Sequence, residues 1–261
     1  MTRYLLRFVA LFYLAFLLVI PVGVVFRRTF ANGFGVFWDS ITTPEAVHAF
    51  KVTLIVALVA VALNTVFGVG VSLLLVRRNF RGKRVLNLLI DLPLAISPVV
   101  VGLALILVYG RLTPIGEWFG NRGIDILYAI PAMVMATAFV SLPLVVRELV
   151  PVLEEIGTDQ EQAASTLGAS AFQTFRRITL PAIRWALVYG IILTFARSLG
   201  EFGAIAVVSG RIRNETQTLT LLVHERYTNF DQEGAYAISF TLAFIAIVSM
   251  VVLTAVRPKE R

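Results

Sequence analysis

The chain lacks cysteine entirely and contains little histidine and little charge. The absence of cysteine among 261 residues excludes disulfides, thiolate nucleophiles and thiolate metal sites. The two histidines, His48 and His224, lie far apart in predicted loops, so we assign them no metal-binding role. There is no G-x-x-x-x-G-K-[ST] motif, the loop that cradles nucleotide phosphates. We therefore expect no cofactor in this chain, and any ATP must be used by another subunit.

Charged residues make up only 15% of the sequence, whereas hydrophobic residues make up 58% and the mean hydropathy is +0.84. These values lie far outside the usual range for a soluble domain. A helix needs about 20 mostly apolar residues to cross a bilayer, and the backbone of such a segment must satisfy its own hydrogen bonds. The composition therefore predicts an all-α integral membrane protein, with residues 1–261 forming a single transmembrane domain.

Long apolar runs predict six spans. The first begins with Arg3 and Arg7 and resembles a signal peptide, but its apolar run is long and no small-residue cleavage site follows, so we expect it to be retained. Gly68, Gly70 and Ser72 in the second span predict close helix packing. Six spans place both termini on the same side of the membrane. The predicted spans cover residues 4–26, 50–76, 85–109, 127–146, 185–208 and 235–256.

The distribution of lysine and arginine predicts which side that is. Fourteen of the 23 lie in the N-terminal segment, the 77–84 loop, the 147–184 loop and the C-terminal tail, and eight lie in the loops of the opposite face. Basic residues favour the cytoplasmic side, so both termini and the 147–184 loop are predicted to be cytoplasmic. The basic stretch RRNFRGKR at 77–84 is then an anchor at the lipid surface, and no nucleic-acid partner is expected.

The 147–184 loop predicts two short helices. TDQE at 158–161 and SAFQ at 170–173 both fit a capping box, in which a Ser or Thr and the residue three positions later cap the helix start reciprocally. Gly168 lies where a left-handed residue would end the first helix. Ala163 and Ala164 would let another protein approach closely, although a helix lying on lipid headgroups fits the physical pattern comparably well.

The spacing within this loop resembles the EAA loop of ABC importer permeases. The matching residues are Gln162, Ala163, Ala164, Gly168, Ile178, Leu180 and Pro181. The usual glutamate of that pattern is Gln162 here, with Glu161 immediately before it. The resemblance implies a type I importer (MetI-like) permease fold in which this loop seats in a cleft of a separate ATPase subunit, and the partner is a dimer of such subunits. The implied ATPase-coupling residues are Glu161, Gln162, Ala163, Ala164, Leu167 and Gly168.

Four further segments resemble the sulfate and molybdate branch of that family, most closely its W-type sulfate and thiosulfate permease subunits. These segments are residues 92–107, 139–170, 195–210 and 216–227. The resemblance implies an inner-membrane permease of a prokaryote. It also implies a homologous T-type permease partner, an extracytoplasmic sulfate-binding protein, and ATP and magnesium bound by the ATPase rather than by this chain.

Three polar residues are candidates for the translocation path. Arg197 and Glu201 are spaced one helical turn apart in the fifth predicted span, and ionisable groups at membrane depth usually face a bundle interior or a water-filled path. One hypothesis is that Arg197 attracts the anion while Glu201 limits how tightly it is held; the other is that the pair only neutralises itself. Pro93 and Pro98 are expected to interrupt the helix of the third span, and Ser97 offers a hydroxyl beside the kink.

Three other functions compete with this one. A molybdate or tungstate permease would handle a similar tetrahedral dianion. An ion-driven secondary transporter would often show inverted repeats, and no convincing repeat relates residues 1–130 to 131–261. A membrane-embedded enzyme would need a cluster of His, Cys or paired acids, which the sequence does not suggest.

Overall fold

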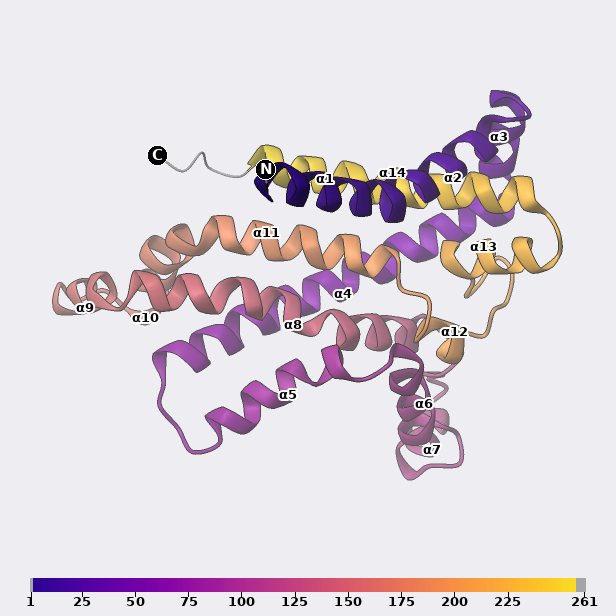
Figure 1. The fold of residues 1–261 in the computed structure, drawn as a ribbon. Coiled ribbons are helices and arrows are strands. Elements are labelled where there is room, and N and C mark those ends of the chain that lie inside the picture. The colour runs from indigo at the N-terminus through magenta and orange to yellow at the C-terminus, as the bar shows by residue number, and fades with distance from the viewer. Residues whose placement is uncertain (1, 257–261) are drawn as a thin grey trace.

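A computed structural model describes residues 2–256, and the regular elements in this part of the chain are helices (Figure 1). Two of them, η1 and η2, are π-helical segments inserted in longer helices. In chain order the elements are α1 (Thr2–Leu14), η1 (Ala15–Val19), α2 (Ile20–Phe30), α3 (Phe34–Thr42), α4 (Pro44–Arg77), α5 (Lys83–Ala95), α6 (Pro98–Tyr109), α7 (Pro114–Gly120), α8 (Ile130–Ile156), α9 (Asp159–Thr166), α10 (Ala171–Thr174), η2 (Phe175–Thr179), α11 (Leu180–Leu199), α12 (Ile205–Val208), α13 (Leu219–Thr228) and α14 (Gln232–Val256).

The centre of the bundle is the packing of α4, α8 and α11. The α4–α8 contact is close because Gly68 has no side chain: a Cβ there would lie 2.7 Å from Cγ1 of Val145. One turn away, the Asn64 amide donates to the carbonyl of Ala138 and to the Ser141 hydroxyl, both at 2.9 Å. The close helix packing predicted around Gly68 is thus confirmed, whereas a Cβ on Gly70 would meet no neighbour within 4 Å.

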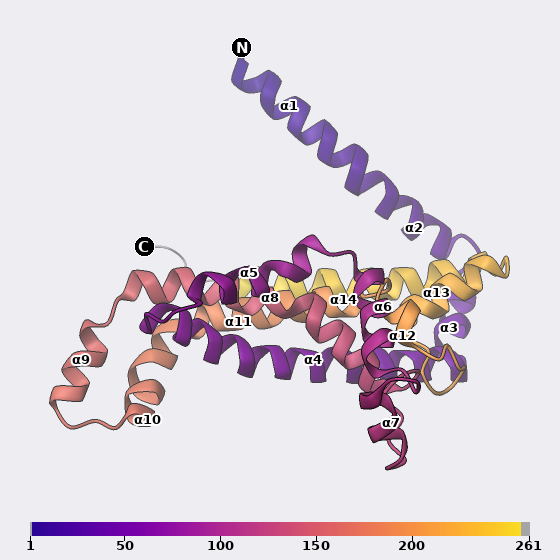
Figure 2. The same ribbon diagram turned by 90° about the horizontal axis from the view of Figure 1, so that it is seen from below.

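The first span stands away from this bundle. Figure 2 shows α1 extending obliquely from the rest of the chain, and none of its most apolar window is buried. Its C-terminal part is held by aromatic contacts, since the rings of Phe26 and Phe30 lie 5.7 and 5.2 Å from that of Phe240 on α14. The exposed apolar surface of α1 is suited to lipid or to another subunit rather than to water.

The third apolar run, predicted as a kinked span at 85–109, consists of two helices with a break just before Pro98, as that proline predicts. The axes of α5 and α6 differ by 113°. Pro98 is the first residue of α6, and Ser97 before it has an extended backbone with φ −60° and ψ 135°. A residue before proline is pushed out of the helical region by the proline ring, so α5 ends at Ala95. The interruption predicted at Pro93 is wrong, because Pro93 lies inside α5, two residues before that helix ends. The described part of the chain therefore has five long apolar helices and one bent pair.

The fifth span also differs from its predicted limits of 185–208. The helix is continuous from Ala171 to Leu199 through α10, η2 and α11, and it ends at Gly200. Glu201 lies beyond it, where its carboxylate accepts the Ala204 N–H at 3.0 Å and helps to start the separate helix α12. Glu201 is therefore in a helix break and not inside a helix as expected.

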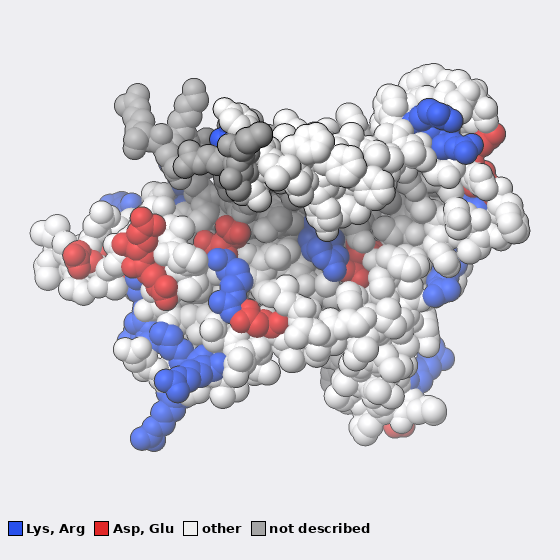
Figure 3. Space-filling view, viewed as in Figure 1, with Lys and Arg blue, Asp and Glu red and all other residues white. Residues whose placement is uncertain are grey.

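The connections fall at two ends of the bundle. Figures 1 and 2 place α9, α10, the α4–α5 turn and the outer ends of α1 and α14 towards one end, and α3, α7 and α13 towards the other. In Figure 3, blue basic atoms gather over the α4–α5 turn, while much of the remaining face is uncharged. The α9–α10 segment and the basic α4–α5 turn, both predicted to be cytoplasmic, thus share one end.

Candidate functional site

The predicted coupling loop forms a helical hairpin that projects from one end of the bundle. Figure 2 shows α9 and α10 beyond the ends of α8 and α11. Gly168 turns the chain between them with φ +83°. α9 ends in a Schellman motif, in which the Ala169 N–H donates to the Ala164 carbonyl and the Gly168 N–H donates to the Ser165 carbonyl, both at 3.0 Å. The predicted left-handed role of Gly168 is therefore confirmed.

Of the two predicted capping boxes, one forms and one does not. At the start of α10, the Ser170 hydroxyl accepts the Gln173 N–H, and the Gln173 side chain accepts the Ser170 N–H. At α9 the prediction is wrong, because the Thr158 side chain makes no bond to a backbone N–H and instead accepts the Gln162 side-chain amide at 2.8 Å. The Glu161 carboxylate is held elsewhere and cannot complete the second box.

The tip of the hairpin exposes apolar side chains. Leu167 is 88% exposed and Phe172 is 69% exposed, and Gln162 and Ala163 beside them are also exposed. Ala164 is half-buried. Large apolar groups on a projecting polar hairpin are typical of a surface that another protein covers. The hairpin thus presents Gln162, Ala163 and Leu167 outward.

Glu161 points the other way, towards the bundle. Its carboxylate receives a two-point contact from Arg77, the last residue of α4, at 3.0 and 3.1 Å. It also accepts the Thr179 hydroxyl at 2.8 Å. The side chains of Arg77 and Glu161 are 13% and 22% exposed. Glu161 is the one charged residue among the six predicted to couple to an ATPase, and its carboxylate is already bound within the chain.

The candidate path residues Arg197 and Glu201 form an ion pair at 2.8 Å. Glu201 is only 2% exposed, and its two carboxylate oxygens contact Arg197 and the Ala204 N–H. Arg197 is 40% exposed, and its terminal nitrogen NH1 makes the contact to Glu201. The Glu201 carboxylate is thus enclosed by protein, whereas part of the Arg197 guanidinium remains exposed.

Ser97 lies at the other helix break, and the two breaks are in contact. A Cβ on Gly203 would lie 3.1 Å from Cβ of Pro98, which places the turn after α11 against the start of α6. Ser97 itself is exposed, and its hydroxyl does not cap α6. Interrupted helices at membrane depth are tolerated where they are enclosed by protein or line a water-filled cavity. The structure therefore brings the regions of Ser97 and Glu201 together.

Sequence reasoning missed a second interhelical ion pair. Arg147 on α8 makes a two-point contact to Asp91 on α5, with Nε 2.7 Å from Oδ1 and a terminal nitrogen on Oδ2. The two residues are 56 positions apart, so no local pattern pairs them. Arginine and carboxylate groups match each other in such paired contacts. The pair therefore joins α5, the first helix of the broken span, to α8.

At the opposite end, a polar hollow is lined by residues of the segment before α13 and of α13 itself. Arg213 there contacts Glu225 and lies 3.4 Å from Glu45. The hydrogen bond and charge of Glu225, with a smaller contribution from Glu45, raise the pKa of the Arg213 guanidinium above its ordinary value. Because its charge is offset by two acids, we assign this hollow no anion site.

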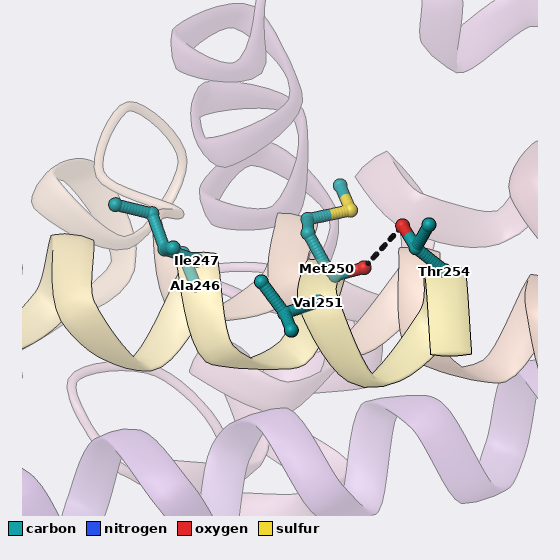
Figure 4. A pocket seen from close by; sticks show the side chains of 5 residues that line it. All are labelled: Ala246, Ile247, Met250, Val251 and Thr254. Atoms are coloured by element: carbon teal, nitrogen blue, oxygen red, sulfur yellow. Dashed lines mark hydrogen bonds between the residues drawn. The ribbon is translucent and has the colours of Figure 1, made fainter. Parts of the chain in front are cut away.

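A further hollow lies along α14 and is mainly aliphatic. Figure 4 shows its lining side chains on one stretch of the helix, with the Thr254 hydroxyl donating to the Met250 carbonyl at 3.0 Å. Such a surface suits acyl chains or another helix and not an anion. Within residues 2–256 no group of three or more His, Cys, Asp or Glu side chains is placed to hold a metal.

Comparison with known proteins places the chain in a family. Residues 64–261 match the family described as "Binding-protein-dependent transport system inner membrane component". The sulfate transport system permease protein CysW of Synechocystis is 46% identical over 249 residues, covering 95% of this chain and 90% of that protein. The sulfate transport system permease protein CysT of Escherichia coli (strain K12) is 38% identical over 230 residues, covering 88% and 83%.

A solved structure agrees in fold. A bacterial alginate ABC transporter, in complex with an alginate pentasaccharide-bound periplasmic protein, superposes with a TM-score of 0.75 over 98% of this chain and 92% of its own, at 17% identity. The predicted all-α, MetI-like permease fold is therefore confirmed, as is the resemblance to W-type permeases. Since the family match covers well over half of its length, this chain belongs to the family of binding-protein-dependent transport system inner membrane components.

Proposed function

We propose that this chain is the W-type permease subunit of an ATP-driven importer that moves sulfate or thiosulfate across the inner membrane of a prokaryote. The observation that carries the proposal is 46% identity to a CysW protein over almost the whole of both chains. The projecting hairpin with its exposed Leu167 supports it, because it offers the attachment surface that a separate motor subunit requires.

Three partners follow from this assignment. The α9–α10 hairpin binds one subunit of an ATPase dimer, and the dimer holds ATP and magnesium. A homologous T-type permease, of the kind that matches this chain at 38% identity, completes the pore as a heterodimer. An extracytoplasmic sulfate-binding protein delivers the anion to the end of the bundle that carries α3, α7 and α13. In this arrangement both termini and the hairpin are cytoplasmic, as the distribution of basic residues favours.

We further propose that Arg197 attracts the anion as it passes the paired helix breaks. Its side chain is 40% exposed and uses one terminal nitrogen for Glu201, whose other carboxylate oxygen accepts the Ala204 N–H. A fully neutralised pair would leave little attraction, but a half-exposed arginine beside an enclosed carboxylate still presents donors to a dianion. Transient attraction, not tight binding, is what transport requires.

The assignment is tested by uptake of labelled sulfate into proteoliposomes that contain the complete transporter, loaded with ATP. We expect uptake that needs ATP and the binding protein, and that unlabelled thiosulfate competes more strongly than molybdate. Stronger competition by molybdate would move the assignment to a molybdate permease. Uptake by this chain alone under an ion gradient would overturn the importer assignment altogether.

The role of Arg197 requires a comparison that separates anion attraction from charge balance. Arg197→Gln alone leaves the buried Glu201 carboxylate without its counter-charge, which is destabilising in itself. In the double variant Arg197→Gln/Glu201→Gln, the new amide oxygen can still accept the Ala204 N–H. We expect both variants to raise the KM for sulfate-loaded binding protein or lower kcat by about tenfold, the effect of losing about 1.4 kcal/mol. If the double variant transports normally, the pair serves only to neutralise itself.

A further inference from the structure

Arg77, Glu161 and Thr179 form one contact network, here called the hairpin node, that joins the α9–α10 hairpin to the transmembrane helices. We propose that the hairpin node transmits hairpin movement to α4 and α11, and that Glu161 is a positioning residue inside this chain and not a contact to the ATPase. This inference rests on the proposed function, since it presupposes that a motor subunit moves the hairpin.

The hairpin node uses both terminal nitrogens of the Arg77 guanidinium as hydrogen-bond donors. One of them, NH1, donates to the Leu153 carbonyl at 3.0 Å, near the end of α8. The other, NH2, donates to Oε1 of Glu161 at 3.1 Å, and Nε lies 3.0 Å from Oε2 in an ion-pair contact without a hydrogen bond. A guanidinium bound on both edges is fixed in orientation, because its donors form a rigid planar fork. Arg77 is thus clamped between α8 and α9.

Glu161 is held from a second side. Oε1, which accepts from Arg77, also accepts the Thr179 hydroxyl at 2.8 Å, and Thr179 is only 3% exposed. Thr179 is the last residue of η2, the π-helical segment that leads into α11. π-helical turns are rare and occur frequently at functional sites. One carboxylate therefore touches the end of α4 and the start of α11 at the same time.

The helix ends reinforce these contacts. Arg77 closes the 34-residue helix α4, where a cation is favoured by the partial negative charge of the terminal carbonyls. Glu161 lies in the first turn of α9, where an anion is favoured by the exposed N–H groups. Because the two side chains are only 13% and 22% exposed, water and salt screen their attraction less than that of a surface pair.

The geometry gives the hairpin two faces with different tasks. Leu167 and Phe172 are outward and largely uncovered by this chain, while Glu161 is inward and bound. A displacement of α9 would pull on α4 through the Arg77 contact and on α11 through the Thr179 contact. Among the six predicted coupling residues, Glu161 then carries motion and Leu167 carries attachment.

The test uses the complete transporter with the variants Arg77→Gln, Glu161→Gln and Arg77→Gln/Glu161→Gln. The control is Arg78→Gln, because Arg78 is adjacent but exposed. Three quantities are measured: ATPase subunit retained on purification, ATP hydrolysis with and without loaded binding protein, and sulfate imported per ATP hydrolysed.

We expect the node variants to retain the ATPase as the control does, but to import about tenfold less sulfate per ATP, which is within the usual range of coupling between sites. The double variant should be no worse than either single variant, because the same contact is lost in each. A purely structural role would lower yield or retention without changing the ratio of import to hydrolysis.

Two results would overturn the inference while leaving the proposed function intact. One is loss of the ATPase from Glu161→Gln to the extent seen when Leu167 is made acidic, since Glu161 would then be an attachment residue. The other is an import-to-hydrolysis ratio in Arg77→Gln equal to that of Arg78→Gln. Absence of any bound ATPase from the unmodified transporter would instead overturn the proposed function.

Discussion

Replacement of Leu167 by aspartate is expected to detach the ATPase and reduce sulfate import to background. Leu167 is 88% exposed at the end of α9, immediately before the Gly168 turn, so the substitution leaves the fold of the hairpin unchanged. A central apolar anchor of a protein interface is worth about 2 kcal/mol or more, which corresponds to about a 30-fold loss of affinity before the cost of burying a charge. The measurement is the amount of ATPase that copurifies with the tagged permease.

The matched control is Leu112→Asp, because Leu112 is fully exposed between α6 and α7, and α7 lies at the end of the bundle opposite the hairpin (Figure 1). We expect this variant to retain the ATPase. The absence of cysteine allows a second check, since Leu167→Cys introduces the single thiol of the chain. Labelling of that thiol by an impermeant reagent in intact right-side-out cells would place the hairpin outside and contradict its proposed role.

Substitution of Gly68 by valine is expected to cause the largest loss of stability. A Cβ at this position would lie 2.7 Å from Cγ1 and 2.8 Å from Cβ of Val145, a side chain that is itself fully buried. Neither helix can yield easily, because α4 and α8 pack along much of their length and are joined by the Asn64 hydrogen bonds. Overpacking of this kind costs about 1–3 kcal/mol or more. Thermal unfolding of the purified permease in detergent measures the effect.

Gly70→Val is the control for this change, since nothing lies within 4 Å of a Cβ there and valine is a better helix former than glycine. We expect its unfolding temperature to equal or slightly exceed that of the unmodified chain. The loss of stability that Gly68→Ala alone causes should be partly recovered by adding Val145→Ala, which makes room for the new Cβ. Equal unfolding temperatures for Gly68→Val and Gly70→Val would show that α4 and α8 do not pack as described.

Features that depend on neighbours in sequence were predictable. The spans follow from apolar runs whose length matches a bilayer, and the Gly168 turn and the Ser170 cap each involve residues within five positions of one another. Such contacts form where no distant partner competes for the same groups. They indicated the membrane class and the hairpin without knowledge of the packing.

Features that depend on distant partners were not predictable. Thr158 and Glu161 have the spacing of a capping box, but Arg77, 84 positions away, takes the carboxylate. Pro98 signals a bend, yet its size of 113° depends on how α6 packs against α12 and α8. Asp91 and Arg147 each look like isolated charges until the fold joins them. Glu201 follows Arg197 by four residues, the spacing of one helical turn, although the helix ends before Glu201.

The π-helical segment η2 has a consequence for the phase of the hairpin. A π-helix closes its hydrogen bonds over five residues, one more than an α-helix does. The wider turn therefore absorbs one extra residue within 175–179. Deleting one residue there would leave an ordinary α-helical turn with the hairpin facing nearly the same way. The same deletion in the regular helix α11 would rotate everything before it by about 100°, one residue's share of a 3.6-residue turn. The wide turn is thus a place where this helix tolerates a change of length by one residue without redirecting the outward leucine.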